Sequence, residues 1–460
     1  MIKTGSNDSG MQLRYLLSAN NILYLLLLII LGLSAISFNI AANDSNDENS
    51  NNIFPLHFSV IDKVYADEEE GDKSINISSS RNNSDKNVPF TGVNVRGFYT
   101  SIQYDTDRYP HAPPFPAEYY ENSFRLISQA GMNHVRYVLY WEAYEKNPSL
   151  FMKELEAVAS TADKWKLKVL YDNHQYHTSS WLDPTNGTGF PASLFESNSS
   201  SYPQGSGGEP KDKSAKMWWT KWWDRSVEDT NGNDGWILQL QFLKKIVNTV
   251  DSHPSTIGYE ILNEPQIHND NQWTKVGKYN TFMVDELRKV TQKTIAYSQQ
   301  IPTSIANNPT TSITMTPKNI AKMAPDNKSN VVFKFTLYGL PYDSKYQRDR
   351  LNIFVRGAEL AGIPLYVGEW NNVKREKVND EESGIIFYKI DRQASDIDQK
   401  KAELFIQEFK QLKVWGWAFW NWNYIPHPAP NLNLILIGED GSIDTTKYYE
   451  MLKNAVSETV

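Results

Sequence analysis

The chain of 460 residues contains no cysteine. This absence excludes a disulfide framework, a zinc site built on thiolates and a cysteine nucleophile. It fits an exported protein that does without disulfide bonds. Positive charge is also in deficit, because 54 Asp and Glu residues outnumber 46 Lys and Arg residues, which gives a formal net charge of −8. An acidic surface repels phosphates, so the charge argues against a nucleic-acid partner.

A glycine-rich phosphate-binding loop is missing after each strand that the sequence predicts. This argues against the doubly wound open sheet of nucleotide-binding proteins. Aromatic residues, in contrast, are abundant, with 14 Trp, 25 Tyr and 19 Phe. Their flat faces can stack on sugar rings, but aromatics more often fill a large core. Composition alone therefore favours the core role.

Residues 22–42 contain a long apolar run, with Lys3 and Arg14 before it. The positive flank is expected to stay in the cytoplasm, which makes residues 1–21 a short cytoplasmic segment. The length of the run lies between a signal-peptide core and a full membrane span. We expect a membrane anchor, with a cleaved signal peptide as the alternative. The protein would then lie on the extracellular face of the cell membrane, or be secreted after cleavage.

Residues 43–88 are rich in Asn, Asp, Ser and Glu. Such a composition cannot bury enough apolar surface to order itself, so it predicts a flexible, low-complexity spacer. From residue 89 to residue 460 the pattern changes to that of one folded domain.

Strands and helices alternate along this domain. The predicted strands are residues 93–96, 134–138, 167–171, 257–262, 294–298, 331–335, 365–368 and 414–419. The predicted helices include residues 151–165, 238–250, 281–291 and 400–410. Alternation of this kind indicates parallel strands joined by crossover helices, and eight strands predict an α/β fold of the (β/α)₈ barrel type.

A long insertion at about 176–234 follows the third predicted strand. It contains Trp218, Trp219, Trp222 and Trp223, whose i, i+4 spacing makes two adjacent stripes on a helix. These tryptophans could form one wall of a sugar-binding cleft, or they could fix the insertion to the barrel. The sequence favours neither interpretation.

Two predicted strands end in glutamates. Asn263, Glu264 and Pro265 follow the fourth strand, and Glu369 ends the seventh, roughly opposite in a barrel of eight. Barrel enzymes carry catalytic residues at the carboxyl ends of their strands. Cleavage of a glycosidic bond with retention requires two carboxyl groups about 5 Å apart, one as acid/base and one as nucleophile. The pair therefore predicts both a fold and a reaction.

Residues 89 to about 425 resemble glycoside hydrolase family 5, the cellulase-type barrels. The motifs that carry the resemblance are VNVRG at 93–97, GMNHVR at 131–136 with WEA at 141–143, DNHQ at 172–175, ILNEP at 261–265, VGEW at 367–370 and GWAFW at 416–420.

The resemblance implies that Glu264 is the acid/base and Glu369 the nucleophile. Arg136 would stand beside Glu369 and keep that carboxylate ionised. Tyr338 would donate a hydrogen bond to the nucleophile. No metal or organic cofactor is implied, because proton transfer and covalent catalysis suffice.

The resemblance also implies that His174 and Asn263 bind sugar hydroxyls and that Trp420 forms the floor of the cleft. One position departs from the family. The sixth strand in this family usually ends in His-x-Tyr, whereas Thr336 stands here in the position of the histidine. Threonine is shorter and carries no charge, so substrate choice or subsite geometry is expected to differ.

The sequence therefore predicts a retaining glycosidase with a monomeric catalytic domain and an oligosaccharide or polysaccharide substrate. A β-1,4-glucan is the expected substrate, and a β-mannan or another β-glycan is the alternative. A barrel that binds surface glycans without cleaving them is an interpretation of a different class, although binding alone does not require both glutamates. An intracellular hydrolase is a third, and it would require a different role for the apolar run.

Overall fold

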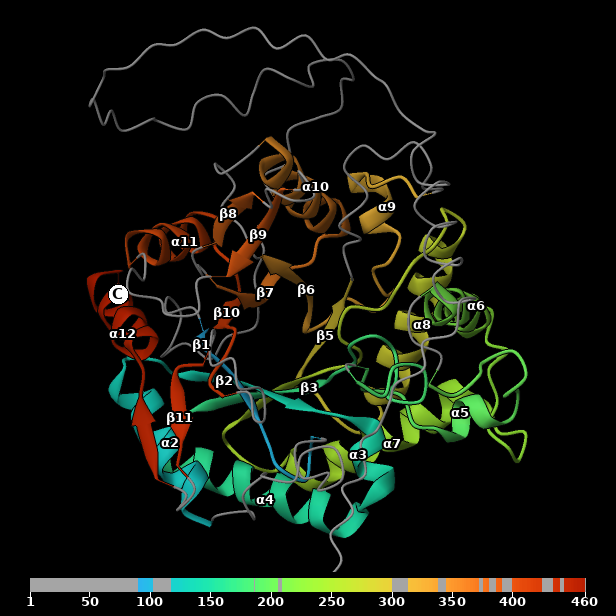
Figure 1. The fold of residues 1–460 in the computed structure, drawn as a ribbon, viewed down its shortest axis with the longest axis horizontal. Coiled ribbons are helices and arrows are strands. Elements are labelled where there is room, and N and C mark those ends of the chain that lie inside the picture. Colours follow the sequence, from blue (N-terminus) through green and yellow to red (C-terminus); the bar gives the residue numbers. More distant parts are fainter. Residues whose placement is uncertain are drawn as a thin grey trace, which may run out of the picture. The chain divides into compact units, whose positions relative to one another are not determined.

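A closed barrel of eight parallel strands forms the centre of the domain (Figure 1). The computed structural model describes residues 90–101, 117–185, 187–205, 209–299, 313–337, 345–371, 375–379, 386–390, 399–423, 433–438 and 442–459, all within the compact unit Ser74–Val460. The barrel strands are β1 (Phe90–Arg96), β2 (His134–Leu139), β3 (Lys168–Asn173), β4 (Thr256–Glu260), β5 (Thr294–Ser298), β6 (Val331–Leu337), β7 (Leu365–Trp370) and β10 (Gly416–Phe419). Around the barrel they follow the order β1-β10-β7-β6-β5-β4-β3-β2.

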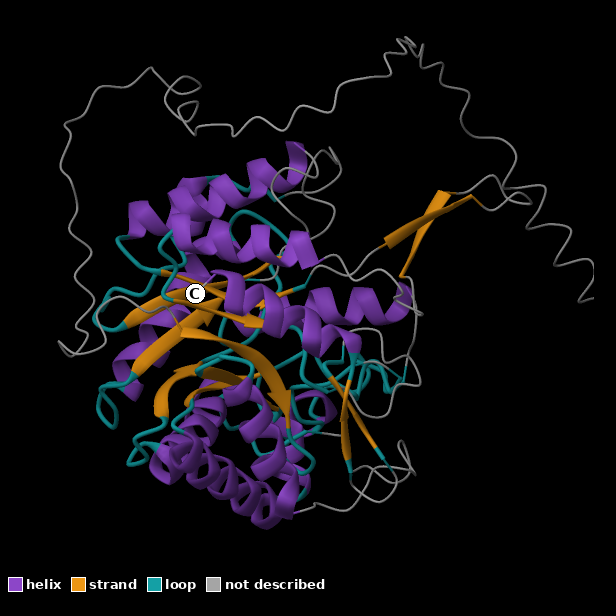
Figure 2. Ribbon diagram, turned by 90° about the vertical axis from the view of Figure 1, so that its left-hand side faces the viewer, coloured by secondary structure: helices purple, strands orange, loops and turns teal. Residues whose placement is uncertain are grey.

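Helices surround the barrel. They are α2 (Ala117–Gln129), α3 (Trp141–Lys146), α4 (Pro148–Trp165), α5 (Ser193–Glu196), α6 (Glu209–Trp223), α7 (Gly235–Val250), α8 (Gln272–Leu287), α9 (Pro317–Ala321), α10 (Lys345–Ala361), α11 (Gln399–Gln411) and α12 (Lys447–Thr459). Two antiparallel strand pairs lie outside the barrel, β8 (Arg375–Asn379) with β9 (Ile386–Ile390) and β11 (Ile435–Ile437) with β12 (Ile443–Thr445). The β8–β9 hairpin follows β7 and extends away from the barrel (Figure 2).

The predicted (β/α)₈ fold is confirmed, and the differences from prediction concern the ends of elements. Strand β4 ends at Glu260, two residues earlier than predicted, so Glu264 lies in the loop beyond it. Helix α8 begins at Gln272 instead of residue 281 and ends at Leu287 instead of residue 291. It ends early because Arg288 closes the turn into β5, where its guanidinium donates to the backbone carbonyls of Thr291 and Lys293.

The interior of the barrel has an apolar layer below a polar layer. Five side chains form the apolar layer: Leu170, Ala296, Val332, Tyr366 and Trp415. Two residues further along their strands, Leu170 is followed by Asp172 and Val332 by Lys334, both fully buried. Side chains at i and i+2 of a strand share a face, so these charged groups also point into the barrel. The polar layer is therefore at the carboxyl ends of the strands, where barrel enzymes carry their active sites.

Side-chain caps and one buried carboxylate fix the connections around the barrel. Asn147 caps α4 by accepting from the amide of Leu150, and Asp234 caps α7 by accepting from the amide of Trp236. The buried carboxylate of Glu154 on α4 accepts three backbone N–H groups of residues 98–100 at 2.6–2.8 Å. This contact fixes the loop after β1 near the carboxyl ends of the strands.

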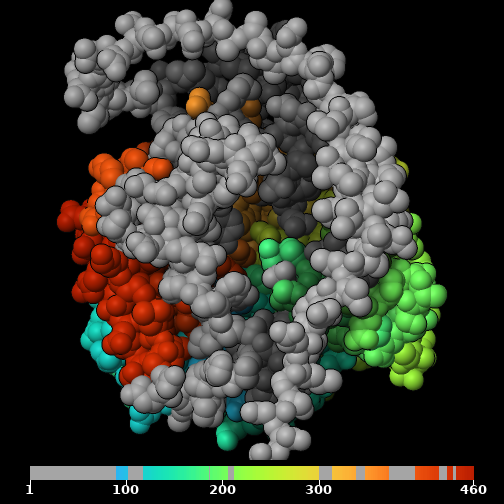
Figure 3. Space-filling model, in the orientation of Figure 1, coloured from blue at the N-terminus to red at the C-terminus, as the bar shows by residue number. Residues whose placement is uncertain are grey.

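The tryptophans of the insertion are buried, which decides between the two interpretations of the stripes. Trp218 stacks on Trp222 at a ring distance of 5.1 Å, and Trp219 stacks on Trp223 at 5.4 Å. All four are at most 2% exposed. They fix α6 to the domain instead of lining a cleft. In Figure 3 the insertion, in green, and α12, in red, lie at opposite edges of the molecule.

The segments predicted for the first part of the chain lie outside the described residues. These are the cytoplasmic segment at 1–21, the anchor or signal segment at 22–42 and the spacer at 43–88. Within the part of the chain that the structure describes, no helix is both long enough and apolar enough to cross a membrane.

Candidate active site

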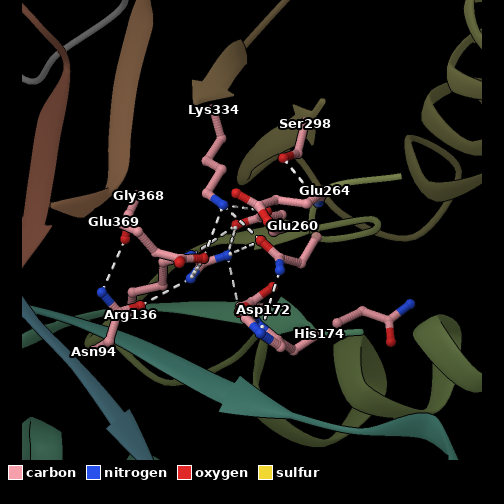
Figure 4. Close-up of polar contacts among 12 residues, drawn as sticks. Asn94, Arg136, Asp172, His174, Glu260, Glu264, Ser298, Lys334, Gly368 and Glu369 are labelled. Carbon is pink, nitrogen blue, oxygen red and sulfur yellow. Dashed lines mark hydrogen bonds and ion pairs between the residues drawn. The ribbon is translucent and has the colours of Figure 1, made fainter. Parts of the chain in front are cut away.

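A bulge in β7 turns Glu369 into the barrel. Along β6 and β7 the register pairs Lys334 with Tyr366 and Phe335 with Val367, but it then pairs Thr336 with Glu369. Strand β7 therefore has one extra residue at Gly368. Strict alternation would point Glu369 away from the inward-facing Tyr366, and a bulge can redirect a side chain in this way. The carboxylate of Glu369 lies among the buried polar groups of the barrel (Figure 4).

The backbone of Glu264 is held in a left-handed conformation, with φ of 42°. Such a conformation is costly for a non-glycine residue and persists where the surroundings enforce it. Gln175 donates from Nε2 to the carbonyls of Asn263 at 3.0 Å and Glu264 at 2.8 Å. The amide of Glu264 donates to Oγ of Ser298 at 3.1 Å. These contacts fix the direction in which the carboxyl group leaves the loop.

Arg136 is the centre of the polar layer, and every nitrogen of its guanidinium has a partner. Nε donates to Oε2 of Glu260 at 2.8 Å, and Nη1 donates to Oδ1 of Asn94 at 2.8 Å. Nη1 also lies 3.2 Å from Oε1 of Glu369, and Nη2 lies 2.9 Å from Oδ2 of Asp172. Arg136 thus stands beside Glu369, as the resemblance implied.

Asn263 and His174 are joined in one hydrogen-bond chain. Oδ1 of Asn263 accepts from Nη2 of Arg136 at 3.0 Å, and its Nδ2 lies 3.2 Å from Nε2 of His174. Nδ1 of His174 lies 2.7 Å from Oδ2 of Asp172. Burial lowers the pKa of His174 to about 3, so its ring is neutral. A neutral ring that donates from Nδ1 to Asp172 leaves Nε2 as the acceptor for Asn263.

Lys334 is a member of the site that the sequence did not identify. Its Nζ lies 3.0 Å from Oε1 of Glu369, 2.5 Å from Oδ1 of Asn263 and 3.1 Å from Oγ1 of Thr336. Thr336 in turn donates to Oε1 of Glu264 at 2.5 Å. The sequence feature that could have identified it is a lysine inside the apolar run of residues 331–337, at an inward position of a barrel strand. Glu260 was missed as well, because the predicted strand ran to residue 262 and placed Glu260 in its interior, whereas β4 ends at Glu260.

The two candidate glutamates differ in their electrostatic surroundings. Burial alone would raise the pKa of Glu369, but the positive charges of Lys334 and Arg136 outweigh burial and hold that pKa well below its usual range. Burial, with the negative charge of Glu369, raises the pKa of Glu264. Opposite shifts of two neighbouring carboxyl groups favour one ionised and one protonated group at neutral pH.

Two further carboxyl groups complete the charge balance of the layer. Burial, which the charge of Arg136 only partly offsets, raises the pKa values of Asp172 and Glu260 to about 7. With Glu369 they amount to three buried carboxyl groups around two cations, Arg136 and Lys334. One proton shared by Asp172 and Glu260 would leave two negative charges against the two positive charges near neutral pH.

The remaining predicted residues are Trp420 and Tyr338. Trp420 is half-buried, and its ring stacks on His174 at a centroid distance of 5.6 Å. The guanidinium of Arg96 lies over the ring of Trp420 at 4.9 Å. Tyr338 lies outside the described residues. The structure thus brings together five of the predicted residues, Glu264, Glu369, Arg136, Asn263 and His174, and sets Trp420 against His174.

Comparisons with known proteins bear on the fold and the class of this chain. The model of the cellulase family, glycosyl hydrolase family 5, matches residues 85–425. An endogalactoceramidase structure is similar at a TM-score of 0.55 and 16% identity, over 80% of this chain and 81% of that chain. Endo-glycoceramidase II from Rhodococcus sp., in complex with a five-membered iminocyclitol, has a TM-score of 0.54 and 16% identity, over 79% of this chain and 78% of that chain. Endoglucanase Cel5A from Pseudomonas stutzeri has a TM-score of 0.46 and 14% identity, over 80% of this chain and 93% of that chain.

No curated protein matches the chain. At these identities the solved structures establish the fold, and the family model establishes the class. Since that model covers most of the chain, the protein belongs to glycoside hydrolase family 5 and is a glycosidase.

Proposed function

We propose that this glycosidase cleaves β-glycosidic bonds with retention of configuration, with Glu369 as the nucleophile and Glu264 as the acid/base. Retention requires one ionised and one protonated carboxyl group on either side of the bond. The observation that carries the proposal is the opposite direction of the two pKa shifts, downward for Glu369 and upward for Glu264. A split of this kind supports this assignment of the two roles.

The reaction would proceed in two displacements. Glu369 attacks the anomeric carbon while Glu264 transfers its proton to the departing oxygen, which leaves a covalent glycosyl-enzyme. Glu264 then takes a proton from water, and the resulting hydroxide attacks the anomeric carbon and releases Glu369. Arg136 and Lys334 stabilise the carboxylate that forms again in this second step.

The substrate would lie on the half-buried ring of Trp420. Its aromatic face suits an apolar face of a sugar ring. His174 and Asn263 would orient sugar hydroxyls, and Tyr338 would donate to the nucleophile. The neutral His174 would act as a hydrogen-bonding group and not as an acid.

The proposed substrate is a β-1,4-glucan, with a β-mannan or another β-glycan as the alternative. A second candidate is the oligosaccharide of a glycosylceramide. It is favoured by the fold similarity to endogalactoceramidase and endo-glycoceramidase II, at TM-scores of 0.55 and 0.54. Both candidates place a β-linked sugar over the same two carboxyl groups.

We also infer an extracellular location, on the membrane or secreted, from the apolar run at residues 22–42, and a monomeric catalytic domain. Protease treatment of intact cells tests the location, because a cytoplasmic domain would be protected. Size-exclusion chromatography with light scattering tests the monomer.

The test of the reaction is product stereochemistry. Cellulose oligomers, mannan oligomers and lactosylceramide would be incubated with the enzyme, and the anomers formed first would be followed by proton NMR. A β product from a β substrate supports the proposal, and an α product overturns the retaining mechanism. Trapping with a 2-deoxy-2-fluoro-β-cellobioside or -lactoside that carries a 2,4-dinitrophenyl leaving group should label the peptide that contains Glu369, and a label elsewhere would contradict its role as nucleophile.

A further inference from the structure

Lys334 lies between the two candidate catalytic glutamates, but it is neither the proposed nucleophile nor the proposed acid/base. Its side chain is 0% exposed, and its ammonium group has three N–H donors. Three acceptors lie within hydrogen-bond distance: Glu369, Asn263 and Thr336. A buried ammonium group persists only where such partners replace water. The position of Nζ is therefore fixed by side chains that belong to the candidate active site.

The neighbouring strand β7 is shaped to receive the side chain of Lys334. A Cβ atom at Gly368 would lie 2.4 Å from Cε, 2.6 Å from Cγ and 3.0 Å from Cδ of Lys334. Any residue larger than glycine would displace the lysine. In Figure 4 the side chain of Lys334 points toward Glu264 and Glu369. The bulge residue of β7 thus provides the space that the lysine needs.

The contact with Thr336 determines the direction of a second hydrogen bond. The hydroxyl group of Thr336 has one proton, and its oxygen accepts from Nζ of Lys334. The proton is then available for Oε1 of Glu264, 2.5 Å away. When Oε1 of Glu264 accepts this hydrogen bond, the proton of the carboxyl group itself is carried by Oε2. Lys334 is thus connected to one glutamate directly and to the other through a single hydroxyl group.

We propose that Lys334 is a positioning residue that keeps Glu369 ionised and, through the hydroxyl group of Thr336, keeps the acidic proton of Glu264 on Oε2. This inference rests on the proposed function, because it assigns Lys334 to the same two carboxyl groups. Among the described residues, the other charged or titratable groups that face these side chains are Arg96 on β1, Arg136 on β2, Asp172 and His174 on and after β3, Glu260 on β4 and Tyr366 on β7.

The first test replaces Lys334 with methionine, which has a similar length and no charge. Removal of the positive charge raises the pKa of Glu369, so the acidic limb of the kcat/KM profile should move to higher pH by about one unit or more. With 2,4-dinitrophenyl β-cellobioside or β-lactoside as the probe, kcat should fall at least tenfold while KM changes little. The matched control is Lys328→Met, an exposed lysine before the same strand, which should retain the wild-type profile.

The second test separates the two connections. Thr336→Val keeps the lysine beside Glu369 but removes the hydroxyl group next to Glu264. It should slow the hydrolysis of 4-methylumbelliferyl glycosides at least tenfold more than that of 2,4-dinitrophenyl glycosides. The first leaving group needs a proton from an acid to depart, and the second does not. Its acidic limb should stay at the wild-type pH. Equal losses on both substrates would overturn the connection through Thr336.

The third test approaches Lys334 from the neighbouring strand β7. Gly368→Ala should displace the lysine and reproduce the upward shift of the acidic limb, and it should add little when combined with Lys334→Met. If Lys334→Met does not fold, Gly368→Ala and Thr336→Val decide the question. If the wild type retains configuration and the pH profile of kcat/KM is unshifted in Lys334→Met or Gly368→Ala, the role of Lys334 alone is overturned. Inverted products from the wild type would instead overturn the proposed function.

Discussion

Oε2 of Glu260 lies 2.8 Å from both Nε and Nη2 of Arg136, so two donors of the guanidinium hold one carboxylate oxygen. Neither side chain is exposed. The same Nη2 reaches Asp172, and the neighbouring Nη1 reaches Glu369. One arginine therefore holds carboxyl groups from three different strands in a fixed arrangement. This relationship leads to the first two predictions.

Replacement of Arg136 by lysine should destabilise the protein although the charge is kept. A lysine has three donors on one nitrogen and cannot reproduce the planar arrangement that satisfies Asn94, Asp172, Glu260 and Glu369 together. Unpaired buried charges typically cost about 3–5 kcal/mol, so we expect a loss of that order in the free energy of unfolding. Urea denaturation would measure it, with the exposed Arg356→Lys on α10 as the control. Equal stability of the two variants would contradict the prediction.

Replacement of Glu260 by glutamine should change how stability depends on pH. Burial raises the pKa values of Glu260 and Asp172 to about 7, whereas in the unfolded chain Asp and Glu titrate near pH 4. Between these values the folded protein holds a proton that the unfolded chain releases, so the contribution of this pair to stability falls as pH rises from about 4 to about 7.

Glu260→Gln removes one member of the pair. Relative to wild type, the variant should therefore gain stability as pH rises across this window, by roughly 3 kcal/mol. Unfolding free energies at pH 4.5, 6 and 8 would measure the difference. A difference that is constant over this range would show that the pair does not take up a proton on folding.

Chemical rescue by azide should distinguish the roles proposed for Glu264 and Glu369. In Glu264→Ala, azide can replace water on the glycosyl-enzyme and should restore turnover of 2,4-dinitrophenyl glycosides with a β-glycosyl azide as the product. In Glu369→Ala, azide would attack the substrate directly and give the α-azide. NMR of the products separates the outcomes. The exposed Glu118→Ala should form neither azide, and the same anomer from both glutamate variants would refute the assignment.

Replacement of Trp218 by alanine should affect stability and not substrate binding. Trp218 is fully buried, stacks on Trp222 and donates from Nε1 to the carbonyl of Leu194. A truncation of this size typically costs about 3–5 kcal/mol. Met217→Ala, at the adjacent exposed position, is the control and should cost little. Unfolding curves and KM would be measured together, and a large rise in KM without loss of stability would favour the cleft-wall interpretation.

The order of strands and the position of both glutamates could be predicted because each depends on local pattern. Apolar runs that end in polar motifs, repeated eight times, indicate a barrel whatever the packing of its helices. Arg136 could be placed beside Glu369 through the resemblance of its motif. The ends of β4 and α8 could not be predicted, because contacts with residues distant in sequence decide where an element stops.

Lys334 and Glu260 escaped prediction for a related reason. Each lies inside a predicted strand, 331–335 or 257–262, whose burial on both faces hides the alternation that would show which side chains point inward. The insertion could not be assigned either, since the spacing of Trp218 and Trp222 is the same for a cleft wall and for a buried helix. Burial decided the question, and burial depends on the tertiary structure.

The extra residue in β7 has a consequence for how this site can be transplanted or redesigned. Gly368 makes room for Lys334, and the same bulge turns Glu369 toward the barrel axis. A recipient barrel with a regular β7 could accept the sequence of β6, but its lysine would face a side chain. The residue in the position of Glu369 would then point into the helical layer. The exchangeable unit is therefore the β6–β7 pair with its irregular register, and single-residue grafts from this enzyme should fail.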